Sequence, residues 1–296
     1  PSLMCGIAGI VNRRTGIEPP SRDALALMAG ALQHRGPDEF GIYRDRDAGL
    51  SHARLSIIDL ATGQQPLCNE RETLWISFNG EIFNYVELAA ELRAQGVRLK
   101  TESDTEVLLR LYEREGIGFL RRLNGMFAIA IDDAREDALY LVRDRIGVKP
   151  LYVAHTEDRV LFASEIKAFG PVAGVKPAWD AIDSIAIDHY LSFNYIPAPW
   201  TIWQNVKHVM PGTWMKFGRS AVHTRASLVR ALAGWRFTGA PAFAGDMQTL
   251  RDSSRHSLDP QAADHRQAAG GKFSRSIACQ NALVLRIEIG HRDRIG

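Results

Sequence analysis

The sequence predicts an α+β fold in which antiparallel β-sheets are covered by helices. Short apolar segments follow one another in pairs through the first 170 residues, and the candidate helices stand apart from them instead of alternating with single strands. That order favours antiparallel sheets over a doubly wound parallel sheet. The chain has 296 residues, 46% hydrophobic and 24% charged, which is ordinary for a soluble protein with one large domain or two modest ones.

Each predicted strand is a short, largely apolar segment next to turn-forming residues. The first contains two glycines within an otherwise apolar run, and we expect it to be buried. The segments expected as strands are 5–11, 40–44, 49–54, 74–79, 126–132, 139–143, 151–154 and 160–164.

Three polar residues mark the starts of predicted helices. Ser21, Asn84 and Ser103 are of types that cap helix N-termini, and apolar residues at helical spacing follow each of them. Ser103 and Glu106 form a capping-box pattern, in which the hydroxyl accepts the N–H of Glu106 and the carboxylate accepts the N–H of Ser103. A fourth helix is expected over 185–192.

The texture of the sequence divides the chain into three parts. Residues 5–190 are expected to form one domain, and the proline-rich segment 191–217 a linker. Residues 218–296 have weak periodicity, 11 Arg and one Lys, and carry a net charge of +6, whereas residues 1–217 carry −4. This composition predicts a disordered tail or translation in a shifted reading frame. A basic arm for nucleic acid is disfavoured because no recognisable binding module is present.

Composition excludes several classes of protein. The sequence has no apolar run of 18 residues and no signal-peptide pattern at its start, so we expect no membrane association. Three cysteines suffice neither for a disulfide framework nor, at these spacings, for a zinc site, and no metal site is predicted. A reducing cytoplasm is the expected location.

Cys5 directly follows a methionine that could start translation. If Met4 is removed, the α-amine of Cys5 lies beside its own thiol, and an α-amine with a pKa of about 7.7–8.0 can accept the thiol proton near neutral pH. On composition alone, a cysteine next to an apolar strand reads as a small buried hydrophobic residue. Residues 1–4 must be absent from the mature chain for the catalytic interpretation to hold.

Around Cys5 the sequence resembles the class II glutamine amidotransferases, and within them the glutamine-hydrolysing asparagine synthetases. The resemblance covers about residues 4 to 217. It is carried by motifs in the family's order at 4–9 (MCGIAG), 34–38 (HRGPD), 52–57 (HARLSI), 78–84 (FNGEIFN), 103–106 (SDTE), 125–128 (GMFA), 143–152 (RDRIGVKPLY) and 163–165 (ASE). It implies a four-layer αββα sandwich of the N-terminal nucleophile hydrolase type.

The resemblance implies that Cys5 attacks the side-chain amide of glutamine and forms a γ-glutamyl thioester. The Asn79 side-chain amide and the Gly80 backbone N–H would then hold the oxyanion. An alternative for Asn79-Gly80 is a type I′ hairpin turn, since Asn-Gly is a strong hairpin signal.

Three charged residues are expected to recognise the substrate. The resemblance implies that Arg54 binds the α-carboxylate, that Asp104 binds the α-ammonium, and that Glu81 lies near the amide. Alternatively, Arg54 is an ordinary charge at a strand end and Asp104 an acid favoured by the helix dipole. His34 and His52 raise the alternative of a Cys-His dyad, although the family assigns them structural roles.

The second half of an asparagine synthetase is not recognisable. Its pyrophosphate-binding loop, Ser-Gly-Gly-x-Asp-Ser, does not occur in the sequence. We therefore expect a chain truncated after the amidotransferase domain, needing no cofactor for glutamine hydrolysis, with ATP and magnesium required only by a separately supplied synthetase domain. Such a domain, or a second copy of this chain, is the expected partner. The alternatives are a catalytically silent fragment and an interaction protein that uses the basic tail.

Overall fold

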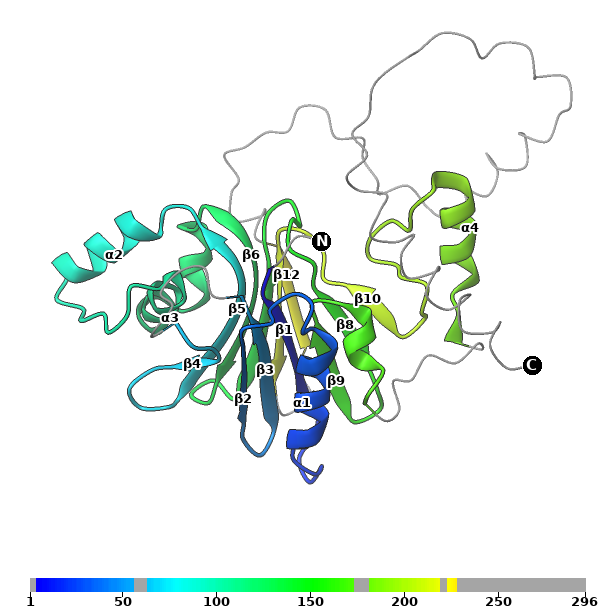
Figure 1. Cartoon of the computed structure of the whole chain (residues 1–296), viewed down its shortest axis with the longest axis horizontal. Coiled ribbons are helices and arrows are strands. Elements are labelled where there is room, and N and C mark those ends of the chain that lie inside the picture. The colour runs from blue at the N-terminus through cyan, green and yellow to red at the C-terminus, as the bar shows by residue number, and fades with distance from the viewer. Residues whose placement is uncertain (1–3, 56–62, 173–180, 219–222, 228–296) are drawn as a thin grey trace, which may run out of the picture. The chain divides into compact units, whose positions relative to one another are not determined.

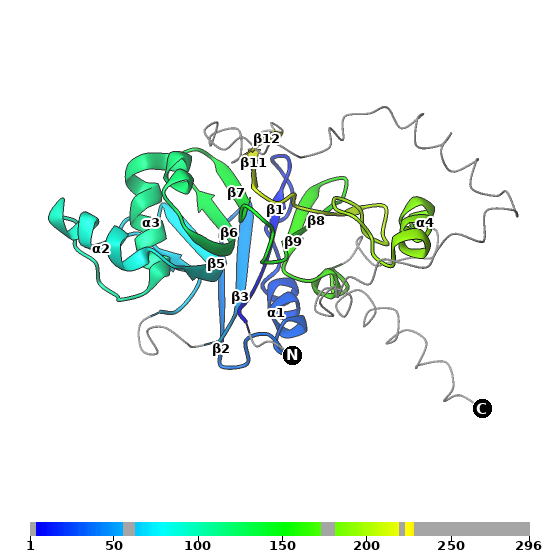
Figure 2. The same cartoon turned by 90° about the horizontal axis from the view of Figure 1, so that it is seen from above.

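The computed structural model describes residues 4–55, 63–172, 181–218 and 223–227. These residues belong to one compact unit, Pro1–Leu232. Two six-stranded antiparallel sheets lie face to face between layers of helix (Figures 1 and 2), which confirms the predicted αββα sandwich. Among the described residues, no helix is both long and apolar enough to cross a membrane.

The first sheet contains the strand that follows Cys5 at its centre. In spatial order its strands are β10 (Val206–His208), β8 (Tyr152–His155), β9 (Arg159–Ala163), β1 (Gly6–Asn12), β3 (Ala48–Arg54) and β2 (Glu39–Arg44). The second sheet runs β12 (His223–Ser227), β11 (Thr213–Gly218), β7 (Ala138–Arg143), β6 (Gly125–Asp133), β5 (Leu74–Ile82) and β4 (Leu67–Cys68).

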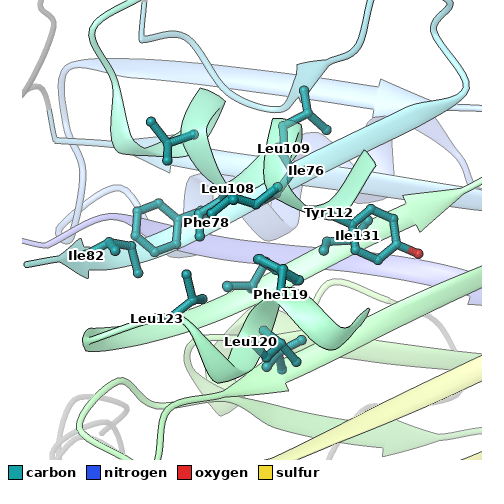
Figure 3. Packing of buried hydrophobic residues seen from close by; sticks show 14 of the residues in the cluster. Ile76, Phe78, Ile82, Leu108, Leu109, Tyr112, Phe119, Leu120, Leu123 and Ile131 are labelled. Atoms are coloured by element: carbon teal, nitrogen blue, oxygen red, sulfur yellow. The ribbon is translucent and has the colours of Figure 1, made fainter. Parts of the chain in front are cut away.

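Helices cover the outer face of each sheet. The second sheet packs against α2 (Tyr85–Ala94), α3 (Asp104–Glu115) and the 3₁₀ helix η1 (Gly116–Arg121), with Phe119 and Tyr112 among the largest fully buried side chains (Figure 3). The first sheet packs against α1 (Arg22–Ala31) and η2 (Ile166–Phe169). These apolar faces drive the layered arrangement.

A third apolar layer joins the two sheets. Ile7, Val11 and Leu50 of the first sheet pack against Ala128 and Leu141 of the second. Side chains on a strand alternate between its two faces, so β1 and β5 each present one row to this layer and one to the helices. The inner rows of β1, β3 and β5 meet at the end of the sandwich where Cys5 lies.

The predicted helix caps at Ser21 and Ser103 form, but the Glu106 half of the predicted capping box does not. The Ser21 hydroxyl accepts the N–H of Ala24, and the Ser103 hydroxyl accepts that of Glu106 at 3.3 Å. The Glu106 carboxylate does not reach back to Ser103. It accepts the N–H groups of Lys100 and Thr101 instead, at 2.9 and 2.6 Å, and so anchors the loop before α3.

The predicted cap at Asn84 is wrong. Asn84 precedes α2 but makes no side-chain bond to it. Its amide donates to the Arg122 carbonyl and accepts the N–H of Asn124, each at 3.0 Å. A distant loop thus competes with the local cap for this side chain, and sequence spacing cannot reveal that contact.

The predicted boundary at residue 190 falls inside the fold. The helix expected over 185–192 forms as α4 (Ser184–Phe193), capped by Asp183. Beyond it, β10 pairs with β8, and β11 pairs with β7, although both lie in the segment expected to be a linker. The backbone of β12, in the segment expected to be a tail, pairs with β11. Such strands depend on partners far away in the sequence, which local patterns do not show. The expected disorder or frame shift beyond residue 227 lies outside the described residues.

Candidate functional site

Cys5 immediately precedes β1 and lies beside the C-terminal end of β3. Gly6 pairs with Ala53, which places Cys5 next to Arg54 and Leu55. The Leu55 N–H donates to the Cys5 sulfur at 3.4 Å. The side chain is only partly buried. The thiol is therefore held by backbone at the rim of the sandwich and remains open to a ligand.

Five influences act on the protonation of the Cys5 thiol. Burial raises the pKa of this thiol and is the largest of them. The Leu55 N–H and the positive charges of Arg54 and Arg35 lower that pKa, and the carboxylate of Asp104 raises it. The net result is a raised pKa, so the thiol needs a base to become a nucleophile near neutral pH. The charges also show that Arg54, Asp104 and Arg35 converge on Cys5.

Arg35 fixes the backbone on both sides of the Met4–Cys5 bond. Its guanidinium donates from Nε to the Cys5 carbonyl at 3.1 Å and from Nη1 to Glu165 at 2.8 Å, and its carbonyl accepts the Met4 N–H at 2.9 Å. The next residue, Gly36, leaves no room for a side chain, since a Cβ there would lie 2.3 Å from the Ala53 carbonyl oxygen. The HRGPD motif is thus a loop packed directly on the nucleophile strand.

One face of β5 crosses the first sheet strand by strand. Trp75 stacks on Tyr43 of β2 with ring centroids 4.1 Å apart, and Ser77 bonds to His52 of β3 at 3.1 Å. Asn79 is two residues further along the same face and therefore lies toward β1, the next strand, which Cys5 precedes. Its Nδ2 atom is buried and has no hydrogen-bond partner among the described residues. Such a donor is rare and suits a ligand.

The hairpin-turn interpretation of Asn79-Gly80 is wrong. Both residues lie inside β5, where Asn79 pairs with Ala128 and Gly80 with Phe127. A Cβ at Gly80 would lie 2.2 Å from the Met126 carbonyl oxygen, so close packing against β6, not a turn, requires glycine here. The Asn-Gly turn signal is overridden by the long apolar strand that contains it.

The backbone N–H of Gly80 points to the edge of β5 that faces away from β6. Phe127 uses its own N–H and carbonyl on the Asp144 side, so the Gly80–Phe127 pair is not hydrogen-bonded. On the same edge, the N–H of Phe78 donates to Gln65 at 2.6 Å and that of Ile82 to Asp104 at 3.4 Å. Gly80 thus presents a donor between two occupied positions.

Asp104 is a buried carboxyl at the start of α3. It is 6% exposed, and burial is the main cause that raises its pKa to about 6, with the negative charge of Glu81 adding to the effect. The Ile82 N–H lowers this pKa but does not outweigh burial. Glu81 is exposed at the end of β5. A positively charged ligand would relieve the burial penalty of Asp104.

Arg54 ends β3 and lines a cavity. Its Nη1 atom lies 2.6 Å from the Glu39 carboxylate. The cavity has a volume of about 240 Å³ and is also lined by Gln64 and Gln65, whereas Cys5 does not line it. Arg54 is 4% exposed, so its guanidinium is held in place for an anionic group.

Neither histidine forms a dyad with Cys5. His52 is fully buried between the sheets, its Nδ1 bonds to Ser77, and burial lowers its pKa to about 3, with Arg54 contributing. His34 contacts Glu165 and Lys167 at the surface. In the part of the chain that the structure describes, neither ring bonds to the thiol.

The RDRIGVKPLY segment is organised around one buried carboxylate, although Ile146 and Val148 within it are exposed. Asp144 is 0% exposed and accepts the backbone N–H groups of Phe127, Val148 and Lys149. Sequence reasoning missed that the Lys149 side chain reaches the Cys5 region. The only indication in the sequence was that Lys149 belongs to one of the motifs that carry the resemblance.

Comparisons with known proteins identify the family of this chain. A family profile described as "Glutamine amidotransferase domain" matches residues 4–227. The chain belongs to this family. Within the family it is similar to asparagine synthetases: it is 42% identical over 211 residues to asparagine synthetase (glutamine-hydrolyzing) 1 of Bacillus subtilis, covering 71% of this chain and 33% of that protein.

Two further relatives extend the comparison. Asparagine synthetase B of Escherichia coli is 43% identical over 170 residues, covering 57% of this chain and 30% of that protein. A putative asparagine synthetase of Mycobacterium tuberculosis is 33% identical over 305 residues, covering 96% of this chain and 46% of that protein. This last alignment includes most of residues 218–296, although the motifs in the sequence indicated a resemblance only as far as about residue 217.

The amidotransferase chain spans about a third or less of the first curated relatives it matches. Solved structures show the same fold. A glutamine phosphoribosylpyrophosphate amidotransferase of B. subtilis is similar with a TM-score of 0.54 and 21% identity, covering 76% of this chain and 49% of that one. A regulatory enzyme of purine biosynthesis has a TM-score of 0.56 and 20% identity over the same shares.

Proposed function

We propose that this chain hydrolyses L-glutamine to L-glutamate and ammonia at Cys5. One observation carries the proposal: the charges of a buried guanidinium and a buried carboxyl act on a partly open thiol, and strand β5 of the facing sheet bears a buried amide donor without a partner in the described structure. Those groups match the carboxylate, the ammonium and the side-chain amide of one amino acid. Membership of the amidotransferase family supports the same chemistry.

In the proposed reaction, the Cys5 sulfur attacks the amide carbon of glutamine while the α-amine of Cys5 accepts the thiol proton. The negative charge that develops on the amide oxygen is stabilised by Asn79 Nδ2 and the Gly80 N–H. The C–N bond then breaks, and the nitrogen leaves as ammonia after taking that proton. Water hydrolyses the thioester, restoring the thiol and releasing glutamate.

Arg54 and Asp104 orient the substrate in this proposal. The guanidinium of Arg54, now beside Glu39, binds the α-carboxylate in its fork of donors. Asp104 binds the α-ammonium, and the exposed Glu81 lies at its side, nearer the amide. This arrangement places the amide, the far end of the molecule, at Cys5.

The proposal requires a chain that starts at Cys5, because an amide nitrogen cannot accept the proton. Intact-mass analysis of the purified protein reports the N-terminus. The direct test is glutamate and ammonia production from glutamine by protein translated from Met4 and confirmed to begin at Cys5. Equal amounts of the two products support the proposal. No glutamate from a folded protein of that mass would reject it in favour of a catalytically silent fragment.

Replacing Asp104 with asparagine should weaken binding and stabilise the fold. Loss of the charge partner of the substrate ammonium should raise KM about 10- to 100-fold. Because the folded-state pKa is raised to about 6, the charged carboxylate destabilises the folded state above that pH, and this effect fades as pH falls toward 4. At pH 7.5 the free energy of unfolding of the variant should therefore exceed that of the wild type, by on the order of 3 kcal/mol at most. Near pH 4 the two free energies should match, and thermal melting at both pH values measures the difference.

The matched control is Asp133→Asn. Asp133 is buried beside Tyr112 and Arg135, which hold its pKa below the usual range despite burial. Its charge stabilises the folded state above the unfolded pKa, so the control should melt below the wild type at pH 7.5 with KM unchanged. Equal melting shifts in the two variants would contradict the assigned role of burial at Asp104.

The fate of the ammonia follows from the relatives. We propose that it serves the ATP-dependent amidation of aspartate in the cytoplasm, carried out by a synthetase domain that supplies the ATP and magnesium sites. Adding a purified synthetase domain of an asparagine synthetase, with ATP, magnesium and aspartate, should give glutamine-dependent asparagine. Asparagine formed only from added ammonium salts would show that the two proteins do not couple.

A further inference from the structure

Lys149 is a buried lysine fixed by its own backbone. Its side chain is 4% exposed. Its N–H donates to Asp144 at 3.0 Å, and its carbonyl accepts from the Arg143 guanidinium at 2.9 Å. The backbone of Lys149 is therefore anchored at both of its polar groups.

The ammonium of Lys149 points to the start of the chain. Its Nζ atom lies 2.9 Å from the thioether sulfur of Met4, which is a weak acceptor. Among the described residues no carboxylate forms an ion pair with Nζ. Burial and the nearby Arg35 lower the pKa of Lys149, and Cys5, Glu81 and Asp144 oppose that effect. Buried lysines are normally paired. An ammonium held without a close anion, at the residue before the nucleophile, needs a functional explanation.

We propose that Lys149 is a positioning residue that favours the deprotonated forms of both Cys5 groups. This inference rests on the proposed function, in which Cys5 begins the chain and Met4 no longer covers Nζ. A nearby positive charge favours a thiolate over a thiol and disfavours an ammonium relative to a neutral amine, so both groups lose their protons at lower pH.

Lys149 differs from the other positive charges near Cys5 because it forms no ion pair among the described residues. Arg54 and Arg35 act in the same direction, but each guanidinium is already paired, with Glu39 and Glu165 respectively. Asp104 opposes them.

The negative charge of Glu81, on β5, acts on both Lys149 and Asp104. Lys149 supplies the positive charge that balances these two carboxylates, since it has no close anion of its own in the described structure.

Two pH titrations test the inference on protein confirmed to begin at Cys5. The first is the alkylation rate of Cys5 by iodoacetamide, read by mass spectrometry on the N-terminal peptide so that Cys68 and Cys279 do not interfere. The second is kcat/KM for glutamine. In Lys149→Met, we expect the midpoint of alkylation and the acid limb of kcat/KM to move up by about one pH unit.

Three variants complete the design. Lys149→Arg keeps the charge and should keep both midpoints near those of the wild type. Lys216→Met removes a lysine of β11 that forms an ion pair with Glu136, and it should change neither midpoint. Lys149→Gln replaces Lys149→Met if circular dichroism shows that the methionine variant is unfolded.

Unchanged midpoints in a folded, uncharged variant would overturn the role of Lys149 while leaving glutamine hydrolysis intact. Absence of glutamate production by the wild type would overturn the proposed function, and the alkylation titration would still decide whether Lys149 acts on Cys5. An equal midpoint shift in Lys149→Arg and Lys149→Met would show that shape and not charge matters, and would also overturn the inference.

Discussion

Replacing Cys5 with alanine is expected to reduce glutamine hydrolysis by about 10⁴-fold or more, since the variant removes the thiol that forms the thioester in the proposed reaction. The fold should be unaffected. The thiol is only partly buried, and it exchanges hydrogen bonds with the backbone of Leu55. Alanine retains the α-amine, so the variant removes the nucleophile and keeps the base. Glutamate production and the melting temperature, measured side by side, check both statements.

Cys68→Ala is the matched control for this experiment. Cys68 is also a partly buried thiol, and it lies in β4, where it pairs with Trp75. Its removal should leave the rate of glutamine hydrolysis unchanged. If Cys5→Ala retains activity that Cys68→Ala loses, the nucleophile is assigned to the wrong residue, and the proposed function fails at its first step.

Replacing Asn79 with alanine is expected to lower kcat about 10²- to 10³-fold with little change in KM. The amide of Asn79 is expected to bind the oxyanion, which exists in the transition state and not in bound glutamine, so its loss acts on the chemical step. Stability should hold, because the variant removes a buried donor that has no partner among the described residues. Steady-state kinetics and thermal melting provide the two measurements.

Ser77→Ala separates this effect from damage to the strand. Ser77 lies two residues earlier on the same face of β5 and bonds to His52 at 3.1 Å. Its loss should lower stability by about 1 kcal/mol and leave kcat unchanged. A rise in KM at constant kcat in Asn79→Ala would mean that Asn79 binds the substrate and not the oxyanion.

The sequence predicts most of this fold because its strands are short apolar segments with clear ends. Strands β1, β2, β3 and β5–β9 form within a few residues of their predicted bounds, and α1, α3 and α4 begin at their predicted starts or one residue away. The errors have a common physical cause. The Asn84 side chain, the Asn79-Gly80 segment and strands β10–β12 all depend on contacts with distant parts of the chain.

The candidate site was predictable only through motifs. No spacing rule links Cys5, Arg54, Asn79 and Asp104, which come from four different elements, and only the resemblance brings them together. In the structure, charges from β3 and α3 act on the Cys5 thiol. Lys149 was not predicted, because its position depends on hydrogen bonds of its backbone. One of these is to the buried Asp144, five residues earlier.

Beyond Ile76, where the short pairing with β4 stops, the edge of β5 that faces away from β6 has no neighbouring strand among the described residues. Side chains of Gln65 and Asp104 occupy two N–H groups where a neighbouring strand would place carbonyls, and Gly80 presents the third. In the proposed reaction, the amide oxygen of glutamine fills the position of that missing strand's carbonyl. Because the side chains of Gln65 and Asp104 already accept the two neighbouring N–H groups, Gly80 offers a single donor here, which suits one small acceptor better than an extended segment of another chain.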